Sequence, residues 1–413
     1  MAQAQTSSNS GSLRALGVVS SAHLAASFCI IGVAPLVPLF QPELKISKVE
    51  VGLMFSLMYF GVVVGSIPGG YLADRLKARP VMVLANVILG AFVFLVGTAT
   101  SYPAALVFLM MVGLGYSALN PVTTKAVVAW FDSRRRATAM SIKQMGVTAG
   151  GMLAAMLLPS IAVFLGWRIA LQIAAVVAVA TAVVTWFVYQ EARDVEVAPQ
   201  VAGRQSGIRD VLFDRQILLL GAVAAIFGMA QVTVSSYLVL FLNEAHFLPA
   251  VVAGFGLAAA QASGMIGRIG WGVASDVFFH GARRKALIWI GVIVVGSTAI
   301  TAVLPYGMSL WVLVPIAALL GVSALGWNGV GMTLAGEASD RTMVGRSSGV
   351  VVGFSFLGSV VWSPIFGYIV DSTGSFGYGW GSVAAVMLVG VFLLRFAVRE
   401  RAARQSLVEG DGR

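Results

Sequence analysis

Three cations and a histidine lie inside long apolar stretches of this sequence. The cations are Lys125, Lys143 and Arg268, and the histidine is His23. All 17 aspartates and glutamates fall between these stretches or at their ends, so the cations would meet no carboxylate there. An uncompensated positive cavity suits an anion, and a guanidinium can hold a carboxylate by two parallel hydrogen bonds. If His23 faces water, it could carry a coupled proton, because an imidazole changes its charge near neutral pH.

Polar and aromatic residues in the same stretches extend this candidate binding site. Gln144 directly follows Lys143 and begins a glycine-rich face. Aromatic rings with a few polar groups are typical of sites for small amphipathic ligands. Each of these side chains would equally suit hydrogen bonding or packing between helices. The further candidates are Asn120, Gln231, Tyr237, Gln261, Trp327 and Asn328.

The sequence shows no pattern of catalytic or metal-binding residues. The three histidines, His23, His246 and His280, are scattered along the chain. We find no glycine-rich phosphate loop and no nucleophile beside a base. We therefore expect no cofactor, no metal and no enzymatic activity. Without a means to hydrolyse ATP, the protein could move a molecule against its gradient only by using an ion gradient or by exchange.

The composition indicates that membrane-spanning helices position these residues. Hydrophobic residues make up 58% of the chain and charged residues 11%, whereas a soluble domain carries about 25% charged residues. The net charge of +10 does not indicate nucleic-acid binding, because 21 of the 27 lysines and arginines fall in tails or loops predicted to share one side. This asymmetry follows the positive-inside rule and predicts that both termini are cytoplasmic.

Twelve apolar stretches are long enough to cross a bilayer, since each crossing needs about 20 residues. We predict an all-α integral membrane protein with twelve transmembrane helices in two pseudo-symmetric six-helix bundles. The bundles would cover residues 15–190 and 216–398, with a cytoplasmic linker at 191–215 and cytoplasmic tails at 1–14 and 399–413. The predicted spans are 15–40, 50–73, 80–99, 103–131, 137–165, 168–190, 216–243, 249–275, 285–304, 309–335, 346–370 and 378–398.

Repeated motifs relate the two halves. Residues 65–74 and residues 267–276 each run from a glycine-rich apolar helix into an aspartate that precedes a basic cluster. The two aspartates, at positions 74 and 276, are 202 positions apart, about half of the 413 residues. The sequence Gly-Tyr-Ser-Ala-Leu at 115–119 also returns as Gly-Val-Ser-Ala-Leu at 321–325, 206 positions later. Matches at a near-constant offset indicate an internal duplication.

The aspartate motif resembles the signature of the major facilitator superfamily. Residues 70–75 with Arg79 resemble the family's sequence between its second and third helices, and residues 272–276 with Arg283 resemble its copy between helices eight and nine. The resemblance covers about residues 14–398 and implies two bundles that rock against each other. It also implies a cytoplasmic gate, in which Asp74, Arg75 and Arg79 hold the start of the eleventh span. The gate residues are Asp74, Arg75, Arg79, Asp276 and Arg283.

A second resemblance concerns the transported molecule. Residues 141–168 look like a group of bacterial organic-anion carriers. Arg268 occupies a position similar to that of a substrate-binding arginine in monocarboxylate and oxalate carriers. Some of those carriers have an aspartate one turn earlier, where this chain has Gly264. The fifth span also lacks the Gly-Pro pair of drug antiporters, which disfavours a multidrug exporter.

We therefore expect a monomeric secondary transporter of the bacterial inner membrane that moves a small organic anion, foremost a carboxylate, by alternating access. Proton symport is the expected coupling, and anion exchange is the alternative. Two rival interpretations stay open: an exporter of drugs or metabolites with broad specificity, and a membrane nutrient sensor that does not transport. The lipid bilayer and the organic anion are the only partners expected.

Overall fold

The computed structural model describes residues 2–192, 214–338 and 344–398, and this part of the chain is helical without strands. Twelve helical segments are long and apolar enough to cross a membrane. Each coincides with one predicted span, so the predicted fold class is confirmed. The first 14 residues, predicted as a tail, belong to helix α1 from Ala2 onward. Most of the predicted linker at 191–215 and the tail at 399–413 lie outside the described residues.

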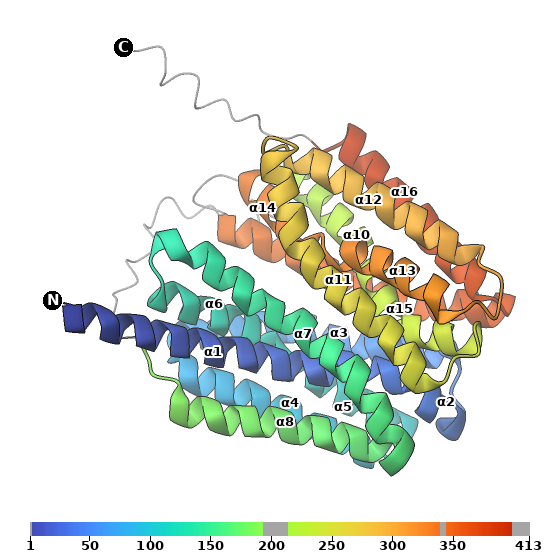
Figure 1. Ribbon diagram of the computed structural model, residues 1–413, viewed down its shortest axis with the longest axis horizontal. Helices are drawn as coiled ribbons and strands as arrows, with labels where there is room; N and C mark the ends of the chain where they lie inside the picture. Colours follow the sequence, from blue (N-terminus) through green and yellow to red (C-terminus); the bar gives the residue numbers. More distant parts are fainter. Residues whose placement is uncertain (1, 193–213, 339–343, 399–413) are drawn as a thin grey trace.

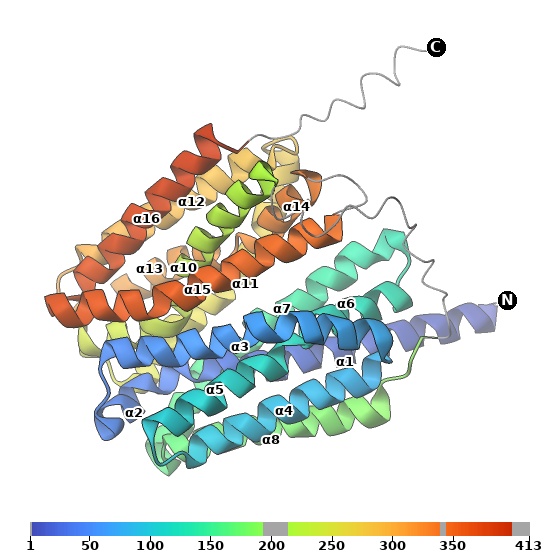
Figure 2. The ribbon, with the colours of Figure 1, turned by 180° about the vertical axis from the view of Figure 1, so that it is seen from behind.

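The helices form two bundles, α1–α8 and α10–α16 (Figures 1 and 2). The first contains α1 (Ala2–Gly32), the 3-10 turn η1 (Ala34–Leu36), α2 (Val37–Leu44), α3 (Lys48–Arg75), α4 (Ala78–Thr98), α5 (Tyr102–Ser117), α6 (Leu119–Trp130), α7 (Ser133–Leu165) and α8 (Trp167–Val188). The second contains α10 (Arg215–Glu244), α11 (Ala250–Val277), α12 (Arg283–Ala302), α13 (Leu310–Leu320), the π-helical segment η2 (Gly321–Leu325), α14 (Asn328–Ala338), α15 (Val344–Thr373) and α16 (Phe376–Phe396).

Local sequence signals set several helix ends. Helix α3 begins with a capping box, in which the Ser47 hydroxyl accepts from the Glu50 amide and the Glu50 carboxylate accepts from the Ser47 amide. These bonds satisfy two amide groups that a helix start leaves without partners. Asp132 and Asp214 cap α7 and α10 in the same general way. These capping residues therefore fix where α3, α7 and α10 begin, and all three helices contact the other half.

The two halves meet where α3 packs on α15 and α7 packs on α11, and α3 and α15 run side by side in Figure 2. Glycines allow close approach there, because a Cβ on Gly52 would lie 2.6 Å from the Pro364 backbone. A Cβ on Gly151 would likewise lie 3.0 Å from the Gln261 side chain across the α7–α11 contact. Small residues at helix interfaces commonly serve this purpose in membranes.

The contacts between the halves are confined to one part of the molecule. We call the side with the first residues of α1 and the last residues of α16 the terminal side, and the opposite side the far side. On the far side, Gly367 packs against the backbone of Lys48. Toward the terminal side, positions 349 and 353 of α15 and 270 and 272 of α11 have open space where a Cβ would be. The bundles are joined on the far side and spread apart on the terminal side (Figure 1).

The fourth and tenth spans are both broken at the repeated motif. Helix α5 ends at Ser117 and α6 starts at Leu119, while η2, residues 321–325, separates α13 from α14. Local π-helical turns are frequent at functional sites. Broken helices at membrane depth are tolerated where the freed backbone groups find partners or line a cavity. The internal duplication therefore marks a structural feature in each half.

Candidate functional site

Arg268 lies on α11 at the terminal end of the contact between the halves. Its Nε donates to the carbonyl of Leu325 at 3.2 Å, and its Nη1 donates to the carbonyl of Gln144 at 3.4 Å. Leu325 belongs to the broken tenth span of the same half, whereas Gln144 belongs to α7 of the other half. Within the described residues, no carboxylate pairs with this guanidinium, since the ion pairs lie elsewhere.

Lys143 provides the second cation of the site from the other half. Its side chain is 1% exposed. The ammonium donates to the Asn120 side-chain oxygen at 3.0 Å and to the Thr124 hydroxyl at 2.9 Å. Both partners are neutral residues of α6, and no acid of the described chain pairs with Lys143. The positive charge is therefore hydrogen-bonded but not neutralised.

His23 of α1 packs against α7, the helix that carries Lys143, since a Cβ on Gly146 would lie 3.4 Å from the His23 Cβ. Its Nε2 is 2.7 Å from the Thr123 hydroxyl oxygen, which in turn lies 2.5 Å from the Leu119 carbonyl. A carbonyl only accepts, so the single hydroxyl proton points to Leu119, and His23 Nε2 must carry the ring proton. The other nitrogen, Nδ1, is buried without a hydrogen-bond partner among the described residues. It is a free proton acceptor beside two cations.

A pair of amides in the second half completes the site. The Gln231 side-chain oxygen accepts from the Trp327 indole and from the Asn328 amide, both at 3.1 Å. Trp327 is fully buried and stacks on Phe227, with 5.1 Å between the ring centroids. Asn328 also donates to the Leu325 carbonyl at 3.5 Å, the same oxygen that binds Arg268. The amide pair and the guanidinium therefore belong to one cluster.

Two further predicted residues lie at the contact between α7 and α11. Gln261 is buried against Gly151, and its amide nitrogen has no partner in the described part of the chain. Gln144 contributes its backbone oxygen to Arg268, while its side chain is half-buried. The structure thus brings together most of the predicted binding residues.

Lys125 is not part of this cluster, although the sequence analysis grouped it with the other cations inside the apolar stretches. Its ammonium donates to the carbonyls of Ala73, Asp74 and Leu76 at 2.7, 3.1 and 3.0 Å. These carbonyls end helix α3, where a cation also interacts favourably with the helix dipole. The long lysine stem carries the charge toward the terminal side, as snorkelling lysines do.

Tyr237 also lies away from the cations. Its side chain is fully buried, and its hydroxyl is 2.8 Å from the Ser363 carbonyl and 3.0 Å from the Lys48 carbonyl. Lys48 begins α3 on the far side. Tyr237 therefore joins the two halves in this conformation. The sequence analysis proposed it for the pocket because it is an aromatic residue with a polar group inside a predicted span.

The predicted gate residues of the second half form a cluster on the terminal side. Arg283 forms an ion pair with Asp276, donates to the Ser275 hydroxyl at 3.0 Å, and lies 3.4 Å from a carboxylate oxygen of Glu337. These contacts join the end of α11, the start of α12 and the end of α14. They lie within one half and do not cross to the other.

The gate residues of the first half contact their own half too. The Arg75 guanidinium stacks over Tyr71 at 4.4 Å, and the Arg79 amide donates to Glu191 at 2.8 Å. Asp74 is exposed. No hydrogen bond or ion pair links Asp74, Arg75 or Arg79 to the described part of α15. The side chains at the start of α15, up to residue 346, lie outside the described residues, so the predicted latch against the eleventh span stays a prediction.

An ion cluster that the sequence analysis missed joins the halves on the far side. The Lys48 ammonium lies 3.0 Å from Glu244 and 3.9 Å from Asp371. The Asp371 carboxylate also accepts from the Val49 amide at 2.9 Å. Lys48 belongs to the first half and both acids to the second. The only sequence signal was that all three charges stand at span ends predicted to share one side.

The sequence analysis also missed Thr123 and Thr124, the partners of His23 and Lys143. Asn120, Thr123 and Thr124 follow the spacing of one helix face, and this pattern was the available signal. The Leu325 carbonyl could not be found in this way, because a backbone oxygen becomes available only through the break in the helix.

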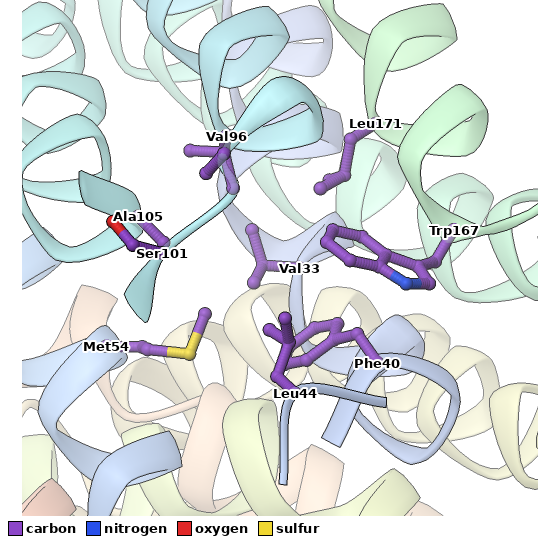
Figure 3. A pocket seen from close by; sticks show the side chains of 10 residues that line it. Val33, Phe40, Leu44, Met54, Val96, Ser101, Ala105, Trp167 and Leu171 are labelled. Carbon is purple, nitrogen blue, oxygen red and sulfur yellow. The ribbon is translucent and has the colours of Figure 1, made fainter. Parts of the chain in front are cut away.

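A small cavity of about 10 Å³ lies in the first half on the far side (Figure 3). That volume holds about one water molecule. Its lining is nearly all apolar and contains none of the clustered cations, so the cavity is not the candidate site. The lining residues are Val33, Phe40, Leu44, Met54, Val96, Ala99, Ser101, Ala105, Trp167 and Leu171.

The sequence matches the family model described as Major Facilitator Superfamily over residues 19–361, which is most of the chain. The chain belongs to the major facilitator superfamily. The resemblance inferred from the aspartate motif is therefore confirmed. As a member of this family with twelve apolar spans, the protein is a multi-pass membrane protein of a transporter family.

Several members of this superfamily are similar over most of their length. A probable galactarate/D-glucarate transporter of Bacillus subtilis (strain 168) is 24% identical, covering 84% of each chain. A probable sulfoacetate transporter of Cupriavidus necator is 23% identical, covering 92% of each chain. A membrane sensor protein of Salmonella typhimurium, UhpC, is 23% identical, covering 76% of this chain and 75% of the sensor.

A solved structure of the same superfamily fold is a bacterial homologue of the human lysosomal transporter Spinster, in an inward-facing and unoccupied conformation. It superposes with a TM-score of 0.75 at 16% identity, covering 94% of this chain and 95% of that chain. At this identity the likeness concerns the fold alone.

Proposed function

We propose that this protein is a secondary transporter of small organic anions, with a carboxylate as the group it binds. The observation that carries the proposal is the pair Arg268 and Lys143, which bring two positive charges from opposite halves to one site. Neither has a carboxylate partner among the described residues. The second amino group of Arg268 is left to donate, and guanidinium groups bind carboxylates strongly. The names of two relatives, for galactarate/D-glucarate and for sulfoacetate, also describe small organic anions.

The arrangement of the halves supports alternating access. Contacts on the far side and separation on the terminal side correspond to a site open in one direction. The excess of Lys and Arg on the terminal side supports a cytoplasmic position for that side in a bacterial inner membrane, by the positive-inside rule. A bound anion would offset the positive charges of Arg268 and Lys143, which come from opposite halves, and so favour the state in which the halves close over it. A ligand shifts such an equilibrium only through this kind of difference in affinity.

Proton symport is the coupling that the site supports. His23 presents an unprotonated nitrogen without a partner in the described chain, beside two cations. An anion bound by those cations would favour the protonated imidazole, because it adds a negative charge nearby. Anion and proton would then bind together and leave together. Anion exchange, the alternative, needs no titrating group.

The direct test is counterflow with purified protein in proteoliposomes. We expect saturable uptake of labelled small carboxylates, and no uptake of neutral or cationic compounds of similar size. Transport of the neutral or cationic compounds would support the rival interpretation as an exporter of broad specificity.

A sensor is the second candidate function, because one relative is named as a membrane sensor protein. A sensor would bind the carboxylate without moving it. Thermal stabilisation by the ligand, measured beside uptake, separates the two, since a ligand raises the stability of the state that binds it. Stabilisation with no uptake would contradict the transporter.

A further inference from the structure

Three amide side chains of the site have orientations that their partners dictate. The indole of Trp327 can only donate, so the Gln231 atom that faces it at 3.1 Å must be the oxygen. The Lys143 ammonium also only donates, so the Asn120 atom at 3.0 Å must be the oxygen. The Leu325 carbonyl only accepts, and Asn328 therefore turns its nitrogen toward it.

These orientations leave a defined set of atoms for a ligand. The nitrogens of Gln231 and Asn120 can donate, and the oxygen of Asn328 can accept. None of the three atoms has a hydrogen-bond partner in the part of the chain that the structure describes. The Gln261 nitrogen also lacks a partner, but unlike these three atoms it is buried away from solvent. Because the Gln231 and Asn328 amides bond to each other at 3.1 Å, a free donor and a free acceptor stand on neighbouring side chains.

This amide pair is attached to the cation of its own half. Arg268 and Asn328 donate to the same Leu325 oxygen, at 3.2 and 3.5 Å. In the other half, Lys143 is bonded directly to Asn120. A ligand whose carboxylate lies at the cations would therefore extend its next groups toward the amides.

We propose that the site selects hydroxylated carboxylates, with a hydroxyl bound between the Gln231 nitrogen and the Asn328 oxygen. A hydroxyl both donates and accepts, so it satisfies a free donor and a free acceptor at once. A keto group only accepts, an ammonium only donates, and an alkyl chain does neither. The proposal rests on the proposed function, because the cations hold the carboxylate, and it adds the amide pair as the determinant of specificity.

The expected discrimination follows from the cost of leaving polar groups unpaired. A site built to bond a hydroxyl can reject the analogue that lacks it by up to about 10⁴-fold when the polar groups become dry. Here the amides keep some contact with water, which can replace part of the lost bonding. We therefore expect a preference of about 10- to 100-fold for a hydroxy acid over its deoxy counterpart.

The test compares matched acids of equal chain length as competitors of uptake by the full-length protein in proteoliposomes: lactate with propionate, 3-hydroxybutyrate with butyrate, and gluconate with hexanoate. For at least one pair, the wild type should bind the hydroxy acid 10-fold or more tightly than its deoxy counterpart. In Gln231→Leu and in Asn328→Leu, the ratio of the two affinities should fall close to one, while the deoxy acids bind as tightly as they bind the wild type. Gln172→Leu, a half-buried glutamine of α8, is the matched control and should keep the preference.

Gln231→Glu covers the case in which a leucine variant fails to fold. It keeps an oxygen for Trp327 and Asn328, replaces the donor by an acceptor and adds a negative charge. All the acids should therefore bind more weakly, and the ratio between hydroxy and deoxy acids should again fall close to one. Equal affinity for hydroxy and deoxy acids in the wild type would overturn the proposal and leave the carboxylate transporter intact. Absence of binding by every acid would instead contradict the proposed function itself.

Discussion

Arg268 of α11 and Asn328 of α14 donate to one backbone oxygen, the carbonyl of Leu325. This oxygen is available because the tenth span is interrupted at the second copy of the repeated motif. The break in the helix therefore holds the Arg268 guanidinium and the Asn328 amide close together, through their shared hydrogen-bond acceptor. Asn120 stands directly after the first copy of the motif and binds Lys143, so each half pairs one cation with one asparagine at its break.

The structure separates the roles of two lysines that looked alike in the sequence. Lys143→Ala should raise the KM for the anion about 10-fold or more, because it removes a charge from the site. Lys125→Ala should leave KM unchanged and lower the melting temperature, because a cation at a helix C-terminus contributes about 0.3–1 kcal/mol. Uptake kinetics and thermal unfolding of both variants check this. An equal rise in KM for Lys125→Ala would return that lysine to the site.

The far-side ion cluster should hold the state that is open on the terminal side. Lys48→Glu places a third negative charge beside Glu244 and Asp371, which should part the halves there. Ser363 is fully buried under Tyr237 on that side, so Ser363→Cys reports the change. In a Cys29→Ala background, an impermeant maleimide should label this position readily only in the Lys48→Glu variant.

The reversed pair supplies the control for that experiment. Lys48→Glu combined with Glu244→Lys restores opposite charges across the halves and should restore much of the protection from labelling. A structural role of either residue alone would not be rescued in this way. Labelling that stays high in the double variant would show that the pairing does not control the far side.

His23 is expected to link uptake to pH. In the wild type, uptake of the anion should rise as the pH falls on the side from which the substrate enters. His23→Gln keeps a donor for Thr123 but cannot titrate, so its uptake should lose this dependence while counterflow continues. Measuring initial rates across a pH series in both proteins is sufficient. An unchanged pH profile in His23→Gln would remove His23 from coupling.

His246 should make the protein less stable in acid. Burial lowers the pKa of His246 in the loop between α10 and α11, and its Nδ1 accepts from the Met308 amide at 3.2 Å. In the unfolded chain the imidazole has a pKa of about 6.5, so it takes up a proton more readily there than in the folded protein. The stability from this group is complete above that value and is lost as pH falls toward the lowered folded pKa.

His246→Gln should therefore reduce the loss of melting temperature between pH 8 and pH 5. The His280→Gln variant, which changes an exposed histidine on the opposite side, provides the comparison. If the wild type and His246→Gln lose stability equally over this range, the buried imidazole is not responsible.

The fold could be predicted because span length and hydropathy depend on the bilayer and not on the packing of helices. The same argument placed Arg268, Lys143 and Lys125 inside the spans. It could not decide whether Lys125 and Tyr237 belong to the site, because a position along a helix does not say which neighbour the side chain reaches. Lys125 turns to the end of α3, and Tyr237 to the contact between the halves.

Other features needed the folded chain. The ion cluster joins Lys48 to acids at positions 244 and 371, and no local pattern relates residues so far apart. The orientations of the amides depend on which partner faces them. The predicted gate involves the first residues of α15, whose side chains lie outside the described residues, so it stays a prediction.

The central claim is that Arg268 binds the carboxylate of the substrate. Its most direct test is the affinity of purified Arg268→Ala for a carboxylate that binds the wild type, measured by calorimetry. Arg395→Ala is the matched control, because this exposed arginine of α16 lies over Phe396 away from the site. Truncating one partner of a buried charged pair costs about 2–5 kcal/mol, so Arg268→Ala should bind at least 30-fold more weakly while Arg395→Ala binds normally. Wild-type affinity in a folded Arg268→Ala protein would contradict the account.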